Sequence, residues 1–165
     1  MPIKKTAFLS SMLAFALILS YIESLIPFPF GIPGMKLGLT NLLVVLILYR
    51  YSAQEALLVN VARILLSGFL FGNGYAILYS LAGGILSLCF MTFLKRTGKF
   101  SVLSISASGG VFHNLGQLFV AAVTVSNYRI AYYAPILMVC GCLTGCLIGL
   151  ISGEVMKRIG RERKD

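Results

Sequence analysis

Six apolar runs, of which the second is short, fill most of this chain of 165 residues and are separated by short polar segments. Hydrophobic residues make up 58% of the sequence and charged residues only 12%, against about 25% charged residues in a typical soluble domain. A soluble domain of this length could not bury that much apolar surface, whereas a membrane-spanning helix needs about 20 mostly apolar residues. The sequence therefore predicts an all-α integral membrane protein, a single domain over residues 1–165 with a bundle of about six transmembrane helices.

The segments between the apolar runs set the limits of the expected spans. Residues 27–34 contain three prolines and two glycines, which exclude a regular helix there. Ser52 followed by Glu55 is a capping box, and it predicts that a helix begins at residue 53. The sequence Gly72-Asn73-Gly74 predicts a tight turn. We expect spans over residues 6–26, 35–49, 53–71, 75–94, 102–125 and 132–156.

The basic residues predict the orientation of these spans. With the N- and C-termini in the cytoplasm, all but three of the 14 Lys and Arg residues fall on the cytoplasmic side; the exceptions are Lys36 and Arg129 outside and Arg63 within a span. Such a bias fits the positive-inside rule. We therefore interpret the net charge of +9 as a topology signal rather than as a surface for nucleic acid. We expect a multi-pass protein of the plasma membrane.

Small residues recur at a spacing of four in the first and last spans, which places them on one face of each helix. Such faces let helices approach closely in lipid. In the last span we expect them chiefly to pack inside the bundle. In the first span, internal packing and contact with a partner helix are both open. The residues are Gly141, Gly145, Gly149 and Gly153 in the last span, and the pairs Ser10 with Ala14 and Ala16 with Ser20 in the first.

Polar side chains within the spans are costly in lipid, so each needs a partner or a function. Most of them gather in the outer half of the expected bundle, beneath residues 27–34. This placement predicts a ligand pocket open to the exterior; interhelical hydrogen bonding and snorkelling to the interface are the alternative. The candidate ligand-binding residues are Glu23, Lys36, Asn41, Tyr75, His113, Asn114 and Gln117. Arg63, near the middle of its span, has either a structural role, with Glu23 as a candidate partner, or a role in ligand binding.

The sequence offers little for catalysis. It has no P-loop for ATP, and its five carboxylates include one Asp, Asp165, in the C-terminal tail. An enzyme that acts on diphosphates with magnesium needs clustered carboxylates, and the lone His113 has no acid and nucleophile beside it. We therefore expect no catalytic activity from this chain alone, and no metal or cofactor.

Two short motifs resemble signatures of a known family. Residues 33–41 read PGMKLGLTN, similar to the PGxKLGLxN signature of the Gx transporters, a family also labelled heptaprenyl diphosphate synthase component I. Residues 113–118 read HNLGQL, similar to its HNxGQL signature. The family resembles the substrate-binding S components of energy-coupling factor transporters. The resemblance implies six helices that bind a small molecule near the outer face, energised by a separate membrane subunit and two ATPases, with Ser10 and Ala14 as the contact for that subunit.

Two functions therefore remain open. The first is an S-component-like subunit that captures a small molecule from outside. The second is a non-catalytic membrane subunit of an isoprenoid or quinone side-chain system, as the older label implies. Soluble prenyl diphosphate synthases use DDxxD motifs, and this chain has none, so the label cannot describe chemistry of its own. The outer polar residues favour the first function, and the sequence does not name the ligand.

Overall fold

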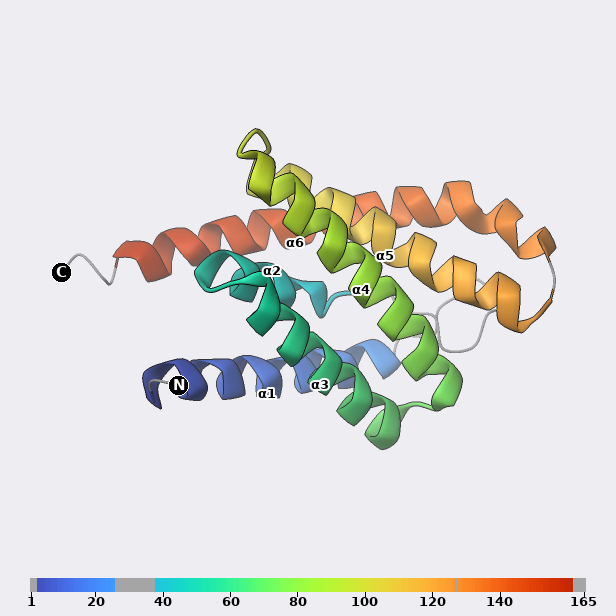
Figure 1. The fold of residues 1–165 in the computed structure, drawn as a ribbon, viewed down its shortest axis with the longest axis horizontal. Helices are drawn as coiled ribbons and strands as arrows, with labels where there is room; N and C mark the ends of the chain where they lie inside the picture. The colour runs from blue at the N-terminus through green and yellow to red at the C-terminus, as the bar shows by residue number, and fades with distance from the viewer. Residues whose placement is uncertain (1–2, 26–37, 127, 162–165) are drawn as a thin grey trace.

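The computed structural model describes residues 3–25, 38–126 and 128–161, and these form six α-helices and one short 3-10 helix, η1 (Figure 1). No strand occurs within these described ranges. The prediction of an all-α bundle is therefore confirmed. The elements are α1 (Ile3–Leu25), α2 (Asn41–Arg50), α3 (Ala53–Phe71), α4 (Gly74–Thr97), α5 (Val102–Thr124), η1 (Tyr128–Tyr133) and α6 (Ala134–Arg161).

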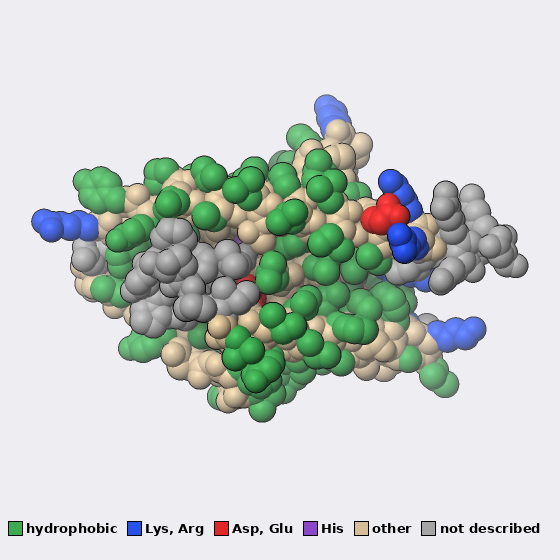
Figure 2. Space-filling view, turned by 180° about the vertical axis from the view of Figure 1, so that it is seen from behind, with side chains coloured by type: hydrophobic (Ala, Val, Ile, Leu, Met, Phe, Trp, Pro, Cys, Tyr) green, Lys and Arg blue, Asp and Glu red, His purple; other side chains and the backbone are tan. Residues whose placement is uncertain are grey.

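Several of these helices are long and apolar enough to cross a membrane. They are α1, α3, α4 and the segment Arg129–Arg158, which contains most of α6. The α5 helix is also 23 residues long, although His113, Asn114 and Gln117, together with several serines, interrupt its apolar sequence. Large hydrophobic side chains lie exposed along the whole bundle, and the space-filling view shows them covering its middle (Figure 2). Such a surface suits a lipid environment, as expected for an integral membrane protein.

Helix starts follow their sequence signals closely. Ser52 accepts a hydrogen bond from the Gln54 amide at 3.2 Å and contacts Glu55, so the predicted capping box caps α3. Asn73, in the predicted turn, accepts a hydrogen bond from the Ala76 amide at 2.9 Å and begins α4 in the same way. These local contacts fix the starts of α3 and α4.

The α2 helix differs from the span expected over residues 35–49. It begins only at Asn41, after a turn over residues 38–40, and residues 35–37 lie outside the described part of the chain. Its 10 residues give a length of about 15 Å, half of the roughly 30 Å hydrocarbon core. The expected second span is therefore a half-length helix.

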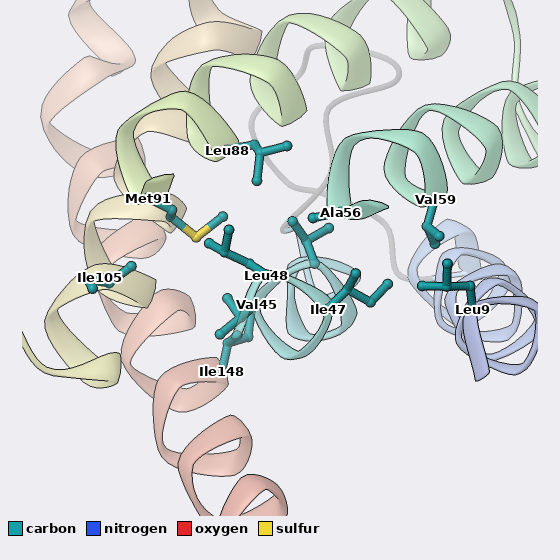
Figure 3. Packing of buried hydrophobic residues seen from close by; sticks show 11 residues of the cluster. Leu9, Val45, Ile47, Leu48, Ala56, Val59, Leu88, Met91, Ile105 and Ile148 are labelled. Carbon is teal, nitrogen blue, oxygen red and sulfur yellow. The ribbon is translucent and has the colours of Figure 1, made fainter. Parts of the chain in front are cut away.

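This short helix lies at the centre of the bundle, where it contacts all five other helices. The six consecutive residues Leu43–Leu48 are all buried. Figure 3 shows Val45, Ile47 and Leu48 surrounded by side chains of every other helix. Those side chains are Leu9 from α1, Ala56 and Val59 from α3, Leu88 and Met91 from α4, Ile105 from α5 and Ile148 from α6. A helix buried on all sides has no polar face, which explains its uninterrupted apolar sequence.

Glycines allow the backbone of α5 to contact the backbones of neighbouring helices. A methyl group at Gly110 would overlap the carbonyl oxygen of Gly141 on α6, and one at Gly145 would lie 2.5 Å from the carbonyl oxygen of Ser106. Gly149 is similarly close to Leu103, whereas Gly153 has nothing within 4 Å. Internal packing of the last-span glycines is thus confirmed for three of the four.

Basic side chains concentrate at one end of the bundle, here named the basic end: the start of α1, the α2–α3 and α4–α5 connections and the end of α6. Lys5 pairs with Glu55 there, and Lys95 donates to the carbonyl oxygen of Leu48. The described basic residues at this end are Lys4, Lys5, Arg50, Lys95, Arg96, Lys99, Lys157 and Arg158. The start of α1 and the end of α6 both lie on this side (Figure 1).

Candidate functional site

The site forms at Gly38, where the two sequence motifs meet in space. Gly38 has a φ of +83°, in the left-handed region that favours glycine. A methyl group there would lie 3.0 Å from Cδ2 of His113 and 3.1 Å from Nδ2 of Asn41. Only a glycine lets the backbone before α2 lie against the imidazole of α5 and the first amide of α2.

Glu23, near the end of α1, fixes this turn in place. Its Oε1 accepts hydrogen bonds from the Gly38 amide and, at 3.3 Å, from the Leu39 amide. The side chain is buried, with 4% of its surface exposed. Hydrogen bonds to a buried carboxylate are stronger than neutral ones. The contact therefore ties the end of α1 to the start of α2.

His113 and Gln117 form the α5 wall of the site. The Nε2 atoms of the two side chains lie 2.6 Å apart. Because an amide nitrogen can only donate, His113 Nε2 accepts in this arrangement. Gly83 on α4 lies directly behind them: a methyl group there would come within 2.6 Å of the His113 carbonyl oxygen and 3.0 Å of Gln117 Cγ. Glycine on α4 thus makes room for both polar side chains.

Asn114 points to a different neighbour. Its Nδ2 donates to the carbonyl oxygen of Leu137 on α6 at 2.7 Å, and its side chain lies beside Gly141. One residue along a helix turns the side chain by 100°, so Asn114 faces α6 while His113 faces α2 and α4. Asn114 therefore connects helices, at least through its amide nitrogen.

Arg63 is buried within the bundle, where it interacts with another side chain of α3 and with a nearby negative charge. It is among the largest fully buried side chains, and its Nη2 donates to Asn60 Oδ1 at 2.6 Å. Glu23 acts on it electrostatically, as the sequence suggested for a partner. Asn60 also approaches α4, because a methyl group at Gly84 would lie 2.7 Å from its Nδ2. Arg63 therefore belongs to a group of buried polar side chains that lies near the site.

Sequence reasoning missed a wider set of buried polar residues. They come from three helices and the turn before α2: Ser20, Thr40, Asn60, Ser67, Ser80 and Ser87. Within the described residues, Thr40 Oγ1, Asn41 Oδ1 and Asn60 Nδ2 have no hydrogen-bond partner. Such atoms are costly unless something else bonds them. The spacing of Asn60, Arg63 and Ser67 at i, i+3 and i+7 was the available signal, because it places one polar stripe on α3.

The profile of the family described as heptaprenyl diphosphate synthase component I matches residues 12–155. This range is most of the chain and contains both motifs. The chain belongs to this family. No curated protein and no solved structure matches it.

Within the component I range, the structure brings together four of the predicted site residues around Gly38: Glu23, Asn41, His113 and Gln117. Tyr75 lies apart, because it is 57% exposed and stacks near Tyr79, with ring centroids 6.5 Å apart. Lys36 and the segment 27–34 lie outside the described residues, so their predicted places over the pocket stay predictions. Ser10 and Ala14 are exposed, whereas Ala16 and Ser20 are buried.

The side chains of this cluster can form directed hydrogen bonds. Its groups are amides, hydroxyls, one imidazole and one carboxylate, each able to fix the orientation of a polar group in an apolar setting. In the described residues no three His, Cys, Asp or Glu side chains gather into a group that could hold a metal ion. The cluster is therefore suited to bind a small molecule through several directed hydrogen bonds.

Proposed function

We propose that this component I family member is the substrate-binding subunit of a small-molecule transporter, resembling the S components of energy-coupling factor transporters. One observation carries the proposal: buried polar side chains of several helices converge on Gly38, away from the basic end. Packing alone does not require polar atoms without partners in the bundle, since apolar side chains would fill the same space at lower cost. A ligand that bonds Asn41 and its neighbours would supply the missing partners.

The proposed orientation places the basic end in the cytoplasm and the polar cluster toward the outer face. The positive-inside rule supports it, and the cluster lies at the end of α1, the start of α2 and the second half of α5. Cysteine at Lys99 should be shielded from an impermeant thiol reagent in intact cells, and cysteine at Arg129 should react. The four native cysteines must first be replaced. Reaction at Lys99 with protection at Arg129 would reverse the orientation.

The proposal assigns no catalytic step to this chain and requires partners that supply energy. The exposed face of α1 offers a contact for them, because Ser10 and Ala14 point away from the bundle. Small residues on an exposed helix face permit close approach of a second membrane helix. The expected partners are a membrane subunit and two cytoplasmic ATPases.

Affinity purification from native membranes, followed by mass spectrometric identification of partners, tests this proposal. We expect ATPases and an energy-coupling membrane subunit with the wild-type chain. The variant Ser10→Leu with Ala14→Leu should lower their recovery at least tenfold, because bulky side chains hold the helices apart. Cys89→Leu with Cys142→Leu is the matched control, since both cysteines are exposed on other helices. Equal recovery with both double variants would contradict the α1 contact.

The family description favours a second candidate, a membrane accessory subunit of a prenyl diphosphate synthase. The same purification separates the two functions. Recovery of a soluble prenyl diphosphate synthase subunit, without ATPases, would replace the transporter proposal by this one.

A further inference from the structure

A groove at the basic end lies apart from the polar cluster. It has a volume of about 220 Å³ and is lined by residues of α1, α2 and α6. Within the described residues, α1 and α6 do not pack against each other, because α2 lies between them (Figure 1). The groove is therefore an open channel along the bundle surface, with α2 as its floor.

Most of the groove lining is hydrocarbon or thioether. Leu46 forms the floor, Phe8 and Met12 form the α1 wall, and Val155 and Met156 form the α6 wall. Methionine side chains adapt to irregular apolar chains because they are unbranched and flexible. A flexible acyl chain suits this lining.

The polar groups of the groove sit at its end, on Tyr49 and Arg50. Arg50 is exposed, and its guanidinium carbon lies 6.0 Å from the Phe8 ring centroid, at the limit of a cation–π contact. Lys5 and Arg158 at the same end are paired with Glu55 and Glu154. Arg50 has no carboxylate partner in the part of the chain that the structure describes.

Other basic side chains near Arg50 add positive charge to this end of the bundle. Among the described residues, eight Lys and Arg side chains lie at the basic end against two glutamates, so their field attracts anions. Lys157 directly follows Met156 of the groove wall and is exposed. An apolar channel that ends at an uncompensated arginine matches a molecule with a hydrocarbon chain and an anionic head.

We propose that this groove binds one anionic phospholipid from the leaflet at the basic end. Its acyl chain lies along Leu46 between Met12 and Met156, and its phosphate bonds Arg50. The site is separate from the proposed partner contact, since Phe8 and Ser10 are two residues apart and thus about 200° apart around α1. It is independent of the polar cluster at Gly38.

Native mass spectrometry of the protein released from nanodiscs of equal phosphatidylglycerol and phosphatidylcholine tests the proposal. We expect the wild-type chain to retain one phosphatidylglycerol molecule in preference to phosphatidylcholine. Arg50→Gln should lower this retention about fivefold, which corresponds to ~1 kcal/mol for one basic residue at the membrane surface. Leu46→Trp should abolish it while keeping every charge, because the larger side chain fills the groove.

Lys99→Gln is the matched control, because it removes one positive charge at the same end from a residue outside the groove. It should change the retention less than twofold. Equal retention of the two lipids by the wild-type chain would overturn the proposal. So would a loss with Lys99→Gln as large as that with Arg50→Gln, which would show a general charge effect.

Discussion

The two faces of α5 meet different surroundings. Toward α6, glycines bring the two backbones into contact, and the one buried amide there, Asn114, bonds a carbonyl oxygen. Toward α2 and α4, the same helix presents His113 and Gln117 to a glycine turn. The first face is closed by backbone contacts, although Ser106 Oγ beside Gly149 has no described partner. The second face meets larger polar side chains, such as the amide of Asn41, whose Oδ1 has no described partner.

Under the proposed function, this difference combines a firm scaffold with a recognition site. In lipid, helices associate through close packing and hydrogen bonds, because apolar contact alone gives no preference. The α5–α6 interface uses both, and it holds α5 at a fixed rotation. His113 and Gln117 are thereby presented to the site at defined positions, which is the condition for directed binding.

The largest effect is expected at the closed face. Gly110→Leu would force a side chain into the Gly141 carbonyl, a backbone atom that cannot move aside. Overpacking of this kind costs about 1–3 kcal/mol or more, and we expect loss of the monodisperse peak in size-exclusion chromatography and a much lower melting temperature. Gly153→Leu, in the same glycine row but with open space around it, should remain within about 0.5 kcal/mol of wild type. Equal stability of the two variants would refute backbone contact at this face.

A smaller loss is expected for Asn114→Ala, which removes the hydrogen bond to Leu137. Interhelical hydrogen bonds in membranes are worth about 0.6 kcal/mol on average and up to about 1.7 kcal/mol. Thermal unfolding in detergent should therefore show a modest decrease, and binding at the second face should persist. Unchanged stability together with lost binding would instead place Asn114 among the ligand-binding residues.

Much of the fold could be predicted from the sequence because its signals are local. The capping box at Ser52, the turn at Asn73 and the glycine row of α6 each act within a few residues or along one helix face. The late start of α2 could not be predicted in this way. It depends on the Glu23 carboxylate of another helix and on the left-handed turn at Gly38, while the apolar run alone is typical of a full span.

The candidate site was predictable in part for the same reason. Glu23, Asn41, His113 and Gln117 stood out because large polar groups are rare in membrane helices. Small hydroxyl groups such as those of Ser80 and Ser87 gave no comparable signal, since serine in a helix can bond its own backbone. Tyr75 was grouped with the site by depth, but a tyrosine at a helix end is also typical of the membrane interface.

The second face of α5 is proposed to bind a small molecule, and the most direct test is native mass spectrometry of the protein purified from membranes. We expect a bound small-molecule adduct on the wild-type chain and on Gly153→Leu. Asn41→Ala and Gln117→Ala should each lower the bound fraction about tenfold or more, the effect of leaving a buried polar group unpaired, with little change in melting temperature. The absence of any adduct on the wild-type chain, or an occupancy in Asn41→Ala and Gln117→Ala equal to that of wild type, would contradict this proposal.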